Sequence, residues 1–249
     1  MLRIGHLELG RIPRVAVALS DVELRHDAAA AKPLADLFEL RIDRFQDHDP
    51  SYVTDVAAQG RAHGVPLLAT VRAADQGGAA ALSDRQRLDV LESVISKVDG
   101  VDIELHATVR DQVVALCRQH RKPVIISHHD FTLTPPDQAL AALIDAGKDA
   151  GADIVKIATA AQGADDCDRL LGLLRTHRSK QLIVIAMGTP GAMSRVFFPL
   201  VGSLLTWGFL HAPSAPGQLP LGELVEELRR YSPEFARQRE ARESERRDA

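Results

Sequence analysis

The feature that most constrains this chain is the alternation of short β-branched runs with longer amphipathic stretches along its whole length. The amphipathic stretches, for example residues 83–97, 108–120, 137–150 and 163–177, carry apolar residues at helical spacing. Eight strand–helix units in 249 residues are typical of a single-domain α/β protein with the (β/α)8, or TIM, barrel fold. The expected strands are residues 14–20, 37–43, 66–72, 100–105, 123–129, 153–158, 181–187 and 202–208. A doubly wound open sheet is the rival fold, but it favours a glycine-rich turn after the first strand, and "LSDVEL" has none.

Two terminal segments flank the repeating part, which is expected to form one barrel domain over residues 1–231. Residues 2–10, "LRIGHLELG", are expected to form a short hairpin that caps the bottom of the barrel. From Ser232 onward the sequence is charged and almost free of apolar residues. Residues 232–249 are therefore expected to be either a helical extension or a disordered tail.

Composition excludes several classes of protein. The formal net charge is −4, with 30 basic and 34 acidic side chains, so we expect no nucleic-acid partner. No apolar run approaches the roughly 18 residues of a membrane span, and the N-terminal residues lack the pattern of a signal peptide. Cys117 and Cys167 have no metal-type spacing and fall in expected helices, which predicts reduced thiols and a cytoplasmic protein.

Polar side chains recur at every second residue near the carboxyl end of successive strands. Because strand side chains alternate between the barrel interior and the helices, each set is expected to point inward. Charge on several consecutive strands is costly to bury without a function, and barrel enzymes carry their active sites at this end. We therefore predict an active site there, formed by Glu39, Arg41, Thr70, Arg72, Asp102, Glu104, Ser127, His129, Lys156 and Met187.

Lys156 lies inside the apolar run "IVKIA" and leaves two interpretations open. If it is desolvated and faces Arg41 and Arg72, its neutral form is favoured, and a neutral amine attacks a ketone to give a Schiff base. Alternatively, its stem runs along the strand and its ammonium reaches a carboxylate at the rim, such as Asp102 or Glu104. The strand by itself favours neither interpretation.

The fifth strand ends in "SHHDF", with two adjacent histidines. His128 and His129 cannot both face inward from a regular strand, so they are a poor chelating pair, and no metal site is predicted. His129 shares its parity with Ser127 and is assigned inward, where acid–base catalysis is the expected use.

Two loops complete the predicted site. In "MGTPGAMSR", Gly188 and Gly191 allow a tight turn into a helix, and Arg195 there suits a carboxylate. The loop "HAPSAPGQLP" is expected to lie over the barrel mouth, where Ser214 and Gln218 could hydrogen-bond a polyhydroxylated ligand.

These motifs together resemble the type I 3-dehydroquinate dehydratases of the shikimate pathway of aromatic amino acid biosynthesis. The resemblance is carried, in order along the chain, by "ELR" (39–41), "TVRAADQGG" (70–78), "SHHDF" (127–131), "VKIA" (155–158), "MGTPGAMSR" (187–195) and "SAPGQ" (214–218). It implies a (β/α)8 lyase, usually a homodimer, that acts on a small polyhydroxylated keto-carboxylate without a metal or organic cofactor.

The resemblance also implies a role for each matching residue. Lys156 would form an iminium with the C3 ketone of 3-dehydroquinate, and His129 would remove a C2 proton and protonate the leaving C1 hydroxyl. Arg195 would pair with the substrate carboxylate. The substrate's hydroxyls and ring would be held by Glu39, Arg41, Arg72, Met187, Ser214 and Gln218.

The sequence departs from the family pattern at four positions. The glutamate that partners the catalytic histidine in the family is Gln76 here, and an amide can orient the imidazole but supplies no charge. His128 replaces a common aromatic residue, Trp207 a typical phenylalanine, and Ile185 a frequent methionine.

Two other functions are compatible with a lysine in a barrel mouth. The first is a class I aldolase-like enzyme that uses Lys156 on another keto substrate. The second is a degenerate barrel that binds a metabolite without turning it over, with Gln76 as an early loss. The presence of both Lys156 and His129 argues against the binding protein.

Overall fold

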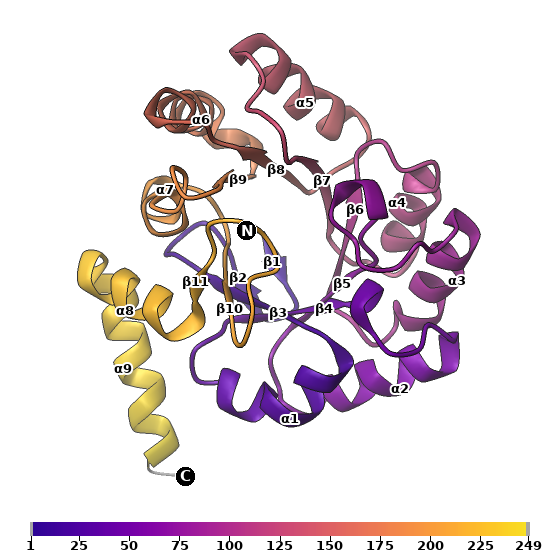
Figure 1. The fold of residues 1–249 in the computed structure, drawn as a ribbon. Coiled ribbons are helices and arrows are strands. Elements are labelled where there is room, and N and C mark those ends of the chain that lie inside the picture. Colours follow the sequence, from indigo (N-terminus) through magenta and orange to yellow (C-terminus); the bar gives the residue numbers. More distant parts are fainter. Residues whose placement is uncertain (1, 248–249) are drawn as a thin grey trace.

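The computed structural model describes residues 2–247 and has eight parallel strands in a ring, with helices outside it (Figure 1). The strands pair in sequence order, as expected for a (β/α)8 barrel, and this prediction is confirmed. They are β3 (Val15–Leu19), β4 (Leu37–Arg41), β5 (Leu67–Thr70), β6 (Gly100–Glu104), β7 (Val124–Asp130), β8 (Ile154–Ala160), β9 (Leu182–Met187) and β10 (Thr206–Phe209).

Nine α-helices are present in the described residues, and eight of them follow the barrel strands. Capping boxes set two of their starts: Ser20 and Glu23 cap α1, and Ser83 and Gln86 cap α3. Three 3₁₀ turns, η1 (Ile42–Arg44), η2 (Ala74–Gln76) and η3 (Arg178–Lys180), lie in the connections. The α-helices are α1 (Asp21–Ala31), α2 (Pro50–Arg61), α3 (Asp84–Val94), α4 (Arg110–Gln119), α5 (Asp137–Asp149), α6 (Ala164–Thr176), α7 (Ser194–Val201), α8 (Leu221–Tyr231) and α9 (Pro233–Arg247). In the described part of the chain, no helix combines the length and apolar composition needed to span a bilayer.

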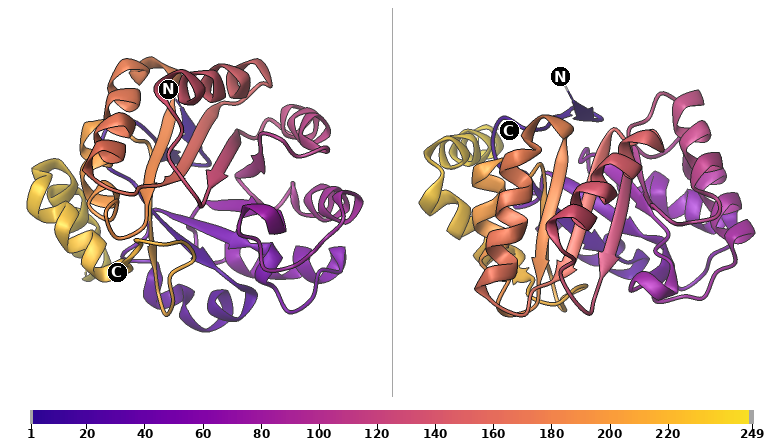
Figure 2. Two further views of the ribbon diagram at one scale, coloured as in Figure 1. Left: turned by 45° about the horizontal axis from the view of Figure 1, so that its top comes forward. Right: turned by 90° about the horizontal axis from the view of Figure 1, so that it is seen from above.

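The expected N-terminal hairpin is present as β1 (Arg3–Ile4) and β2 (Leu7–Glu8), and it covers one open end of the barrel (Figure 2). Its apolar side chains and one layer of inward strand residues form a single buried cluster, which includes Ile4, Leu7, Leu9, Leu37, Leu68, Ile125, Ile154 and Ile183. Two residues further along four of these strands the inward side chain is polar: Glu39, Thr70, Ser127 and Lys156. The hairpin therefore seals an apolar floor below the charged layer.

The eighth strand is shorter than predicted. Residues 202–208 were expected to be extended, but Gly202 ends α7 with a φ of 125°, and β10 begins only at Thr206. No ladder joins β9 to β10 in the described residues. Instead, the Leu204 N–H donates to the Leu182 carbonyl at 2.9 Å, and β11 (Leu219–Pro220) pairs with the free edge of β10.

Residues 233–247 form α9, which lies beside α8 at the edge of the barrel (Figure 1). Phe235 is fully buried and Arg239 is 1% exposed, with its guanidinium over the Phe235 ring. Arg239 and Arg242 bind the two oxygens of Asp36 at 2.7 and 2.6 Å. One buried aromatic ring and this ion-pair cluster dock a helix whose sequence offered almost no apolar pattern; residues 248 and 249 lie outside the described residues.

Replacing Asp36 with asparagine is expected to destabilise the protein by about 3 kcal/mol, because Arg239 would stay buried without its counter-charge. Urea unfolding followed by circular dichroism measures this change. Arg237→Ala, an exposed position on the same helix, is the control and should change the free energy of unfolding by less than about 0.5 kcal/mol. Equal stability of the Asp36 variant and the control would show that the cluster does not dock α9.

Candidate active site

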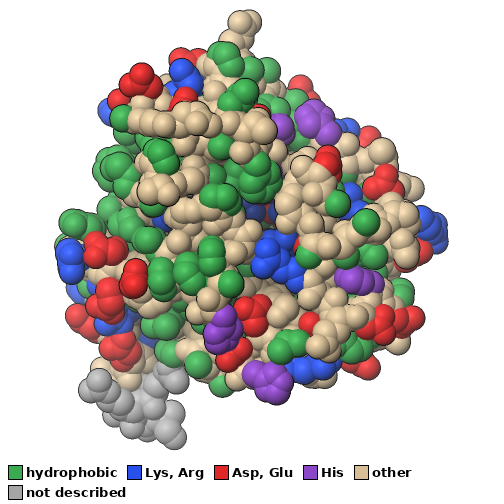
Figure 3. All heavy atoms as spheres, in the orientation of Figure 1, with side chains coloured by type: hydrophobic (Ala, Val, Ile, Leu, Met, Phe, Trp, Pro, Cys, Tyr) green, Lys and Arg blue, Asp and Glu red, His purple; other side chains and the backbone are tan. Residues whose placement is uncertain are grey.

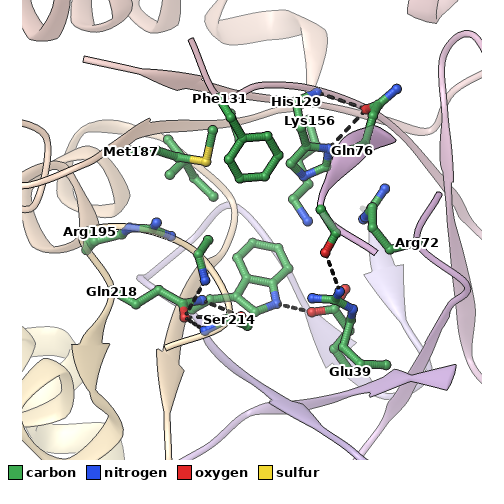
Figure 4. Close-up of a pocket in the computed structure, with 16 residues that line it drawn as sticks. Glu39, Arg72, Gln76, His129, Phe131, Lys156, Met187, Arg195, Ser214 and Gln218 are labelled. Carbon is green, nitrogen blue, oxygen red and sulfur yellow. Dashed lines mark hydrogen bonds between the residues drawn. The ribbon is translucent and has the colours of Figure 1, made fainter. Parts of the chain in front are cut away.

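The carboxyl ends of the strands surround a pocket with about 470 Å³ of empty space, which includes solvent at its open mouth (Figure 4). Ten of the residues expected from the sequence line it: Glu39, Arg41, Arg72, Gln76, His129, Lys156, Met187, Arg195, Ser214 and Gln218. The other four expected residues, Thr70, Asp102, Glu104 and Ser127, do not line it: they are buried and hydrogen-bond to Glu39 or Arg72 instead. The two pattern departures Ile185 and Trp207 also line it, with Gly77, Phe131, Ala158 and Ala215, to which the sequence had given no role. In the described residues, no group of three or more histidines, cysteines or carboxylates is placed to hold a metal ion.

Lys156 lies in the middle of β8 and is 5% exposed. Its Nζ donates to Asp102 Oδ2 at 3.1 Å and lies 4.2 Å from the centre of the Trp207 ring. The lysine is thus desolvated, as one interpretation required, and also paired with a carboxylate, as the other required. The carboxylate is buried in the floor of the pocket, however, and not at the rim.

Asp102 is held in place by three donors. Arg72 Nη2 lies 2.8 Å from Oδ1, the Ser127 hydroxyl 2.6 Å from the same oxygen, and Lys156 binds the other oxygen. Burial alone would raise the pKa of Asp102, but the charges of Arg72 and Lys156 outweigh it and hold that pKa below its ordinary value. Asp102 therefore remains a carboxylate beside the lysine.

The ion pairs extend from Lys156 into a chain of alternating charge. Arg72 also binds Glu104 at 2.9 Å, and Glu104 in turn binds Arg87 of α3. Arg87 was not predicted as part of the site, because it comes from a helix and not from a strand. A signal was present, since Arg87 shares the buried stripe of α3 with Leu91 and Val94.

Glu39 and Arg41 at the end of β4 are both engaged by protein groups. Arg41 makes a two-pronged ion pair with Asp43 at 2.9 and 2.8 Å. Glu39 accepts from the Thr70 hydroxyl at 2.7 Å and from the Trp207 indole N–H at 2.8 Å. Arg41 is therefore charge-paired, whereas Glu39 is held by two neutral donors and forms no ion pair within the described residues.

His129 faces the pocket, whereas its neighbour His128 turns away and packs edge-on against His106, with 6.0 Å between the two ring centroids. Gln76 Oε1 accepts from the His129 backbone N–H at 3.1 Å and lies 3.4 Å from Nδ1. Desolvation, together with the charges of Arg72 and Lys156, lowers the pKa of His129 well below its ordinary value. The imidazole is therefore neutral near neutral pH and can accept a proton.

Arg195, at the start of α7, is 2% exposed. It is as buried as Arg72, but it lacks the carboxylate partners that Arg72 has. Its Nη2 donates to the Pro216 carbonyl at 3.0 Å, and no acidic side chain pairs with it in residues 2–247. Burial lowers the pKa of Arg195 to about 10. A buried cation without a counter-ion, at the edge of a cavity, is prepared to receive an anion.

The loop after β10 closes over the cavity. Gln218 Oε1 accepts from the backbone N–H groups of Ser214 and Ala215, at 2.5 and 3.2 Å, which fixes the turn. Gly217, with a φ of 75°, approaches the Gly188 carbonyl so closely that a Cβ would stand 2.4 Å from it. In Figure 3 basic side chains are visible near the middle of this face.

A single-domain barrel with converging charged groups in a loop-covered cavity at the carboxyl ends of its strands has the architecture of a (β/α)8 enzyme. The model of the type I 3-dehydroquinase family matches residues 15–232, and the chain belongs to that family.

Relatives agree over nearly the whole chain. A 3-dehydroquinate dehydratase from Methanococcoides burtonii is 33% identical over 227 residues, which cover 90% of this chain and 97% of the relative. The 3-dehydroquinate dehydratase of Aquifex aeolicus VF5 has a crystal structure with a TM-score of 0.79 at 31% identity, covering 88% of this chain and 99% of that one. The Clostridium difficile type I enzyme, solved with covalent modified comenic acid, has a TM-score of 0.82 at 28% identity, covering 91% and 95%.

Replacement by methionine is expected to destabilise the protein much more at Arg72 than at Arg195. Arg72→Met leaves Asp102 and Glu104 short of a partner and should cost about 3 kcal/mol or more. Arg195→Met removes an unpaired buried charge and should lower the free energy of unfolding by no more than about 1 kcal/mol. Urea unfolding of both variants tests the contrast, and an Arg195 variant as unstable as the Arg72 variant would contradict it.

Proposed function

We propose that this protein is a class I lyase that dehydrates 3-dehydroquinate to 3-dehydroshikimate through a Schiff base on Lys156, with His129 as general acid and base. The observation that carries the proposal is that a buried lysine, a neutral histidine and an arginine without a counter-ion line one small cavity. These groups provide a nucleophile, a base and a carboxylate site. Membership of the type I 3-dehydroquinase family supports the same activity.

Substrate binding would begin at Arg195. Its planar guanidinium suits a carboxylate, and the pairing would supply the counter-charge that this buried cation lacks. Ser214 and Gln218, in the loop that binds Arg195 through Pro216, would then lie over the ring hydroxyls. Met187, 1% exposed, would pack against the ring. Arg72 and Glu39 would complete the polar wall, and Arg41 would support it through Asp43.

The covalent step requires a neutral amine at Lys156. His129 would take a proton from the ammonium, and the freed Nζ would attack the C3 carbonyl. The protonated His129 would then return that proton to the carbinolamine hydroxyl, which leaves as water and gives an iminium. The iminium carries the positive charge that the ammonium carried before. Asp102 would therefore stabilise both the resting lysine and the covalent intermediate from one fixed position.

The proton transfers would pass through His129. As the neutral base it would take a proton from C2, and the electron pair would move into the iminium to form an enamine. The enamine would expel the C1 hydroxyl, which leaves as water once the imidazolium has protonated it. Hydrolysis of the remaining iminium releases the product and the free lysine. Gln76, which faces Nδ1, would hold the ring orientation during both transfers.

The covalent modification of a solved relative agrees with a nucleophile in this pocket. No contact in the cavity favours the aldolase-like or the metabolite-binding alternative over the dehydratase. A cytoplasmic homodimer completes the proposal, and it rests on composition and on the family resemblance.

Incubation with 3-dehydroquinate and sodium borohydride is expected to convert the iminium into a stable secondary amine on Lys156, because hydride reduces the C=N bond. Peptide mass spectrometry locates the adduct. Lys156→Met should give no adduct and no enone absorbance, whereas Lys32→Met, at an exposed lysine of α1's end, should be labelled like the parent. Adduct on any other lysine, or none at all, would refute the Schiff-base mechanism.

The low pKa of His129 predicts an acid limb of kcat/KM below pH 6.5, the ordinary histidine value, because activity falls only when pH drops through that pKa. Gln76→Glu adds a carboxylate beside the imidazole, raises the pKa of His129 and should move the limb up by about one pH unit. Gln59→Glu adds the same charge on exposed α2 and serves as the control. Identical profiles for both variants would show that Gln76 does not act on His129.

A further inference from the structure

We propose that Trp207 is a positioning residue that holds both Lys156 and Glu39 for the reaction; the assignment rests on the proposed function of the same pocket. Trp207 is 3% exposed, and its two ends contact different charged groups. The ring face lies under the Lys156 ammonium, and the indole N–H donates to Glu39. Of the described pocket residues, no other contacts both of these side chains in this way.

The neighbouring strand makes room for the indole. Trp207 pairs with Ala16 in the β10–β3 ladder, and the next inward residue on β3 is Ala18. Two alanines in the wall between Trp207 and Glu39 leave the space that a large ring needs. The indole can therefore pass over β3 from β10 to Glu39 on β4.

The ring face acts on Lys156. The ammonium lies between the Asp102 carboxylate at 3.1 Å and the centre of the indole ring at 4.2 Å. An aromatic face attracts a cation, most strongly when water is excluded, and tryptophan is the best such face. Because the iminium is a cation at the same atom, the ring favours it over the neutral ketone and amine and restricts the direction in which Nζ points.

The N–H acts on Glu39. Each carboxylate oxygen of Glu39 accepts one internal donor, Thr70 on one side and Trp207 on the other. These two hydrogen bonds fix the plane of the carboxylate and leave lone pairs for a substrate donor. The fixed Glu39 carboxylate therefore favours a keto-carboxylate substrate with a hydroxyl that can donate a hydrogen bond to Glu39. A phenylalanine ring would supply the face for Lys156 without the donor for Glu39.

The N–H contact is tested by kinetics with 3-dehydroquinate. Trp207→Phe should raise KM and lower kcat/KM by about tenfold to a hundredfold, while borohydride still labels Lys156. Thr70→Val removes the other donor to Glu39 and should give a loss of the same kind. In a Glu39→Leu background, Trp207→Phe should change kcat/KM by less than about threefold. Additive losses, or a Trp207→Phe enzyme equal to the parent, would overturn this part.

The ring contact is tested without any substrate, because Trp207 is the single tryptophan of the chain and its emission reports this site alone. Lys156→Met removes the cation over the ring and should change the emission spectrum, whereas Lys32→Met should not. Glu39→Leu removes the N–H acceptor and should shift the emission maximum to shorter wavelength. Unchanged spectra in both pocket variants would overturn the assignment.

The two sets of measurements separate the two proposals. If the parent forms no borohydride adduct and no enone, the dehydratase function fails, and the fluorescence still decides whether Trp207 contacts Lys156 and Glu39. If the parent is labelled and turns over but the Trp207 variants match it, only the positioning role fails. Circular dichroism melting of each variant checks that a loss of activity is not a loss of fold.

Discussion

The structure of the site depends on a buried chain of charges that alternate in sign, from Arg87 through Glu104, Arg72 and Asp102 to Lys156. Each of these side chains is at most 5% exposed, and each carboxylate lies between two cations. Burying an ion is costly unless it is paired and hydrogen-bonded, and each of these five side chains is. The lysine is consequently held at a defined point inside the barrel instead of extending to solvent.

The buried arginines of the pocket differ in whether a protein carboxylate neutralises them. This difference separates the arginines that have a structural role from the one that is free to bind an anion. Arg72 and Arg41 are both neutralised by protein carboxylates, whereas Arg195, equally buried, is bound only by a carbonyl of the closing loop. The charges of Arg72 and Arg41 are thus balanced without a ligand, and the charge of Arg195 is not. An anion that binds there supplies the missing charge and contacts the loop that covers the cavity.

The departures from the family pattern change the surroundings of Lys156 and His129, the two proposed catalytic groups, and leave both residues in place. Gln76 faces the imidazole as a neutral acceptor, so the pKa of His129 is governed by burial and by the cations around it. Trp207, on β10, adds an indole N–H that reaches past β3 to Glu39 on β4. Both changes act on orientation and proton affinity, the two properties that a Schiff-base dehydratase would have to adjust for a given pH and substrate.

The sequence by itself determined the barrel, its hairpin cap and most of the charged side chains that face the pocket, because strand alternation and the repeat of strand and helix are local properties of a chain. His129 and Lys156 could be assigned inward from parity alone. Tertiary structure decided which polar groups pair. Arg87 comes from a helix. Asp102 and Lys156 are 54 residues apart in the sequence, and Trp207 and Glu39 are 168 residues apart. Tertiary structure also decided the late start of β10 and the docking of α9, which depend on one glycine conformation and one ion-pair cluster. Such contacts join residues far apart in sequence, and no local pattern encodes which partner each charge will find.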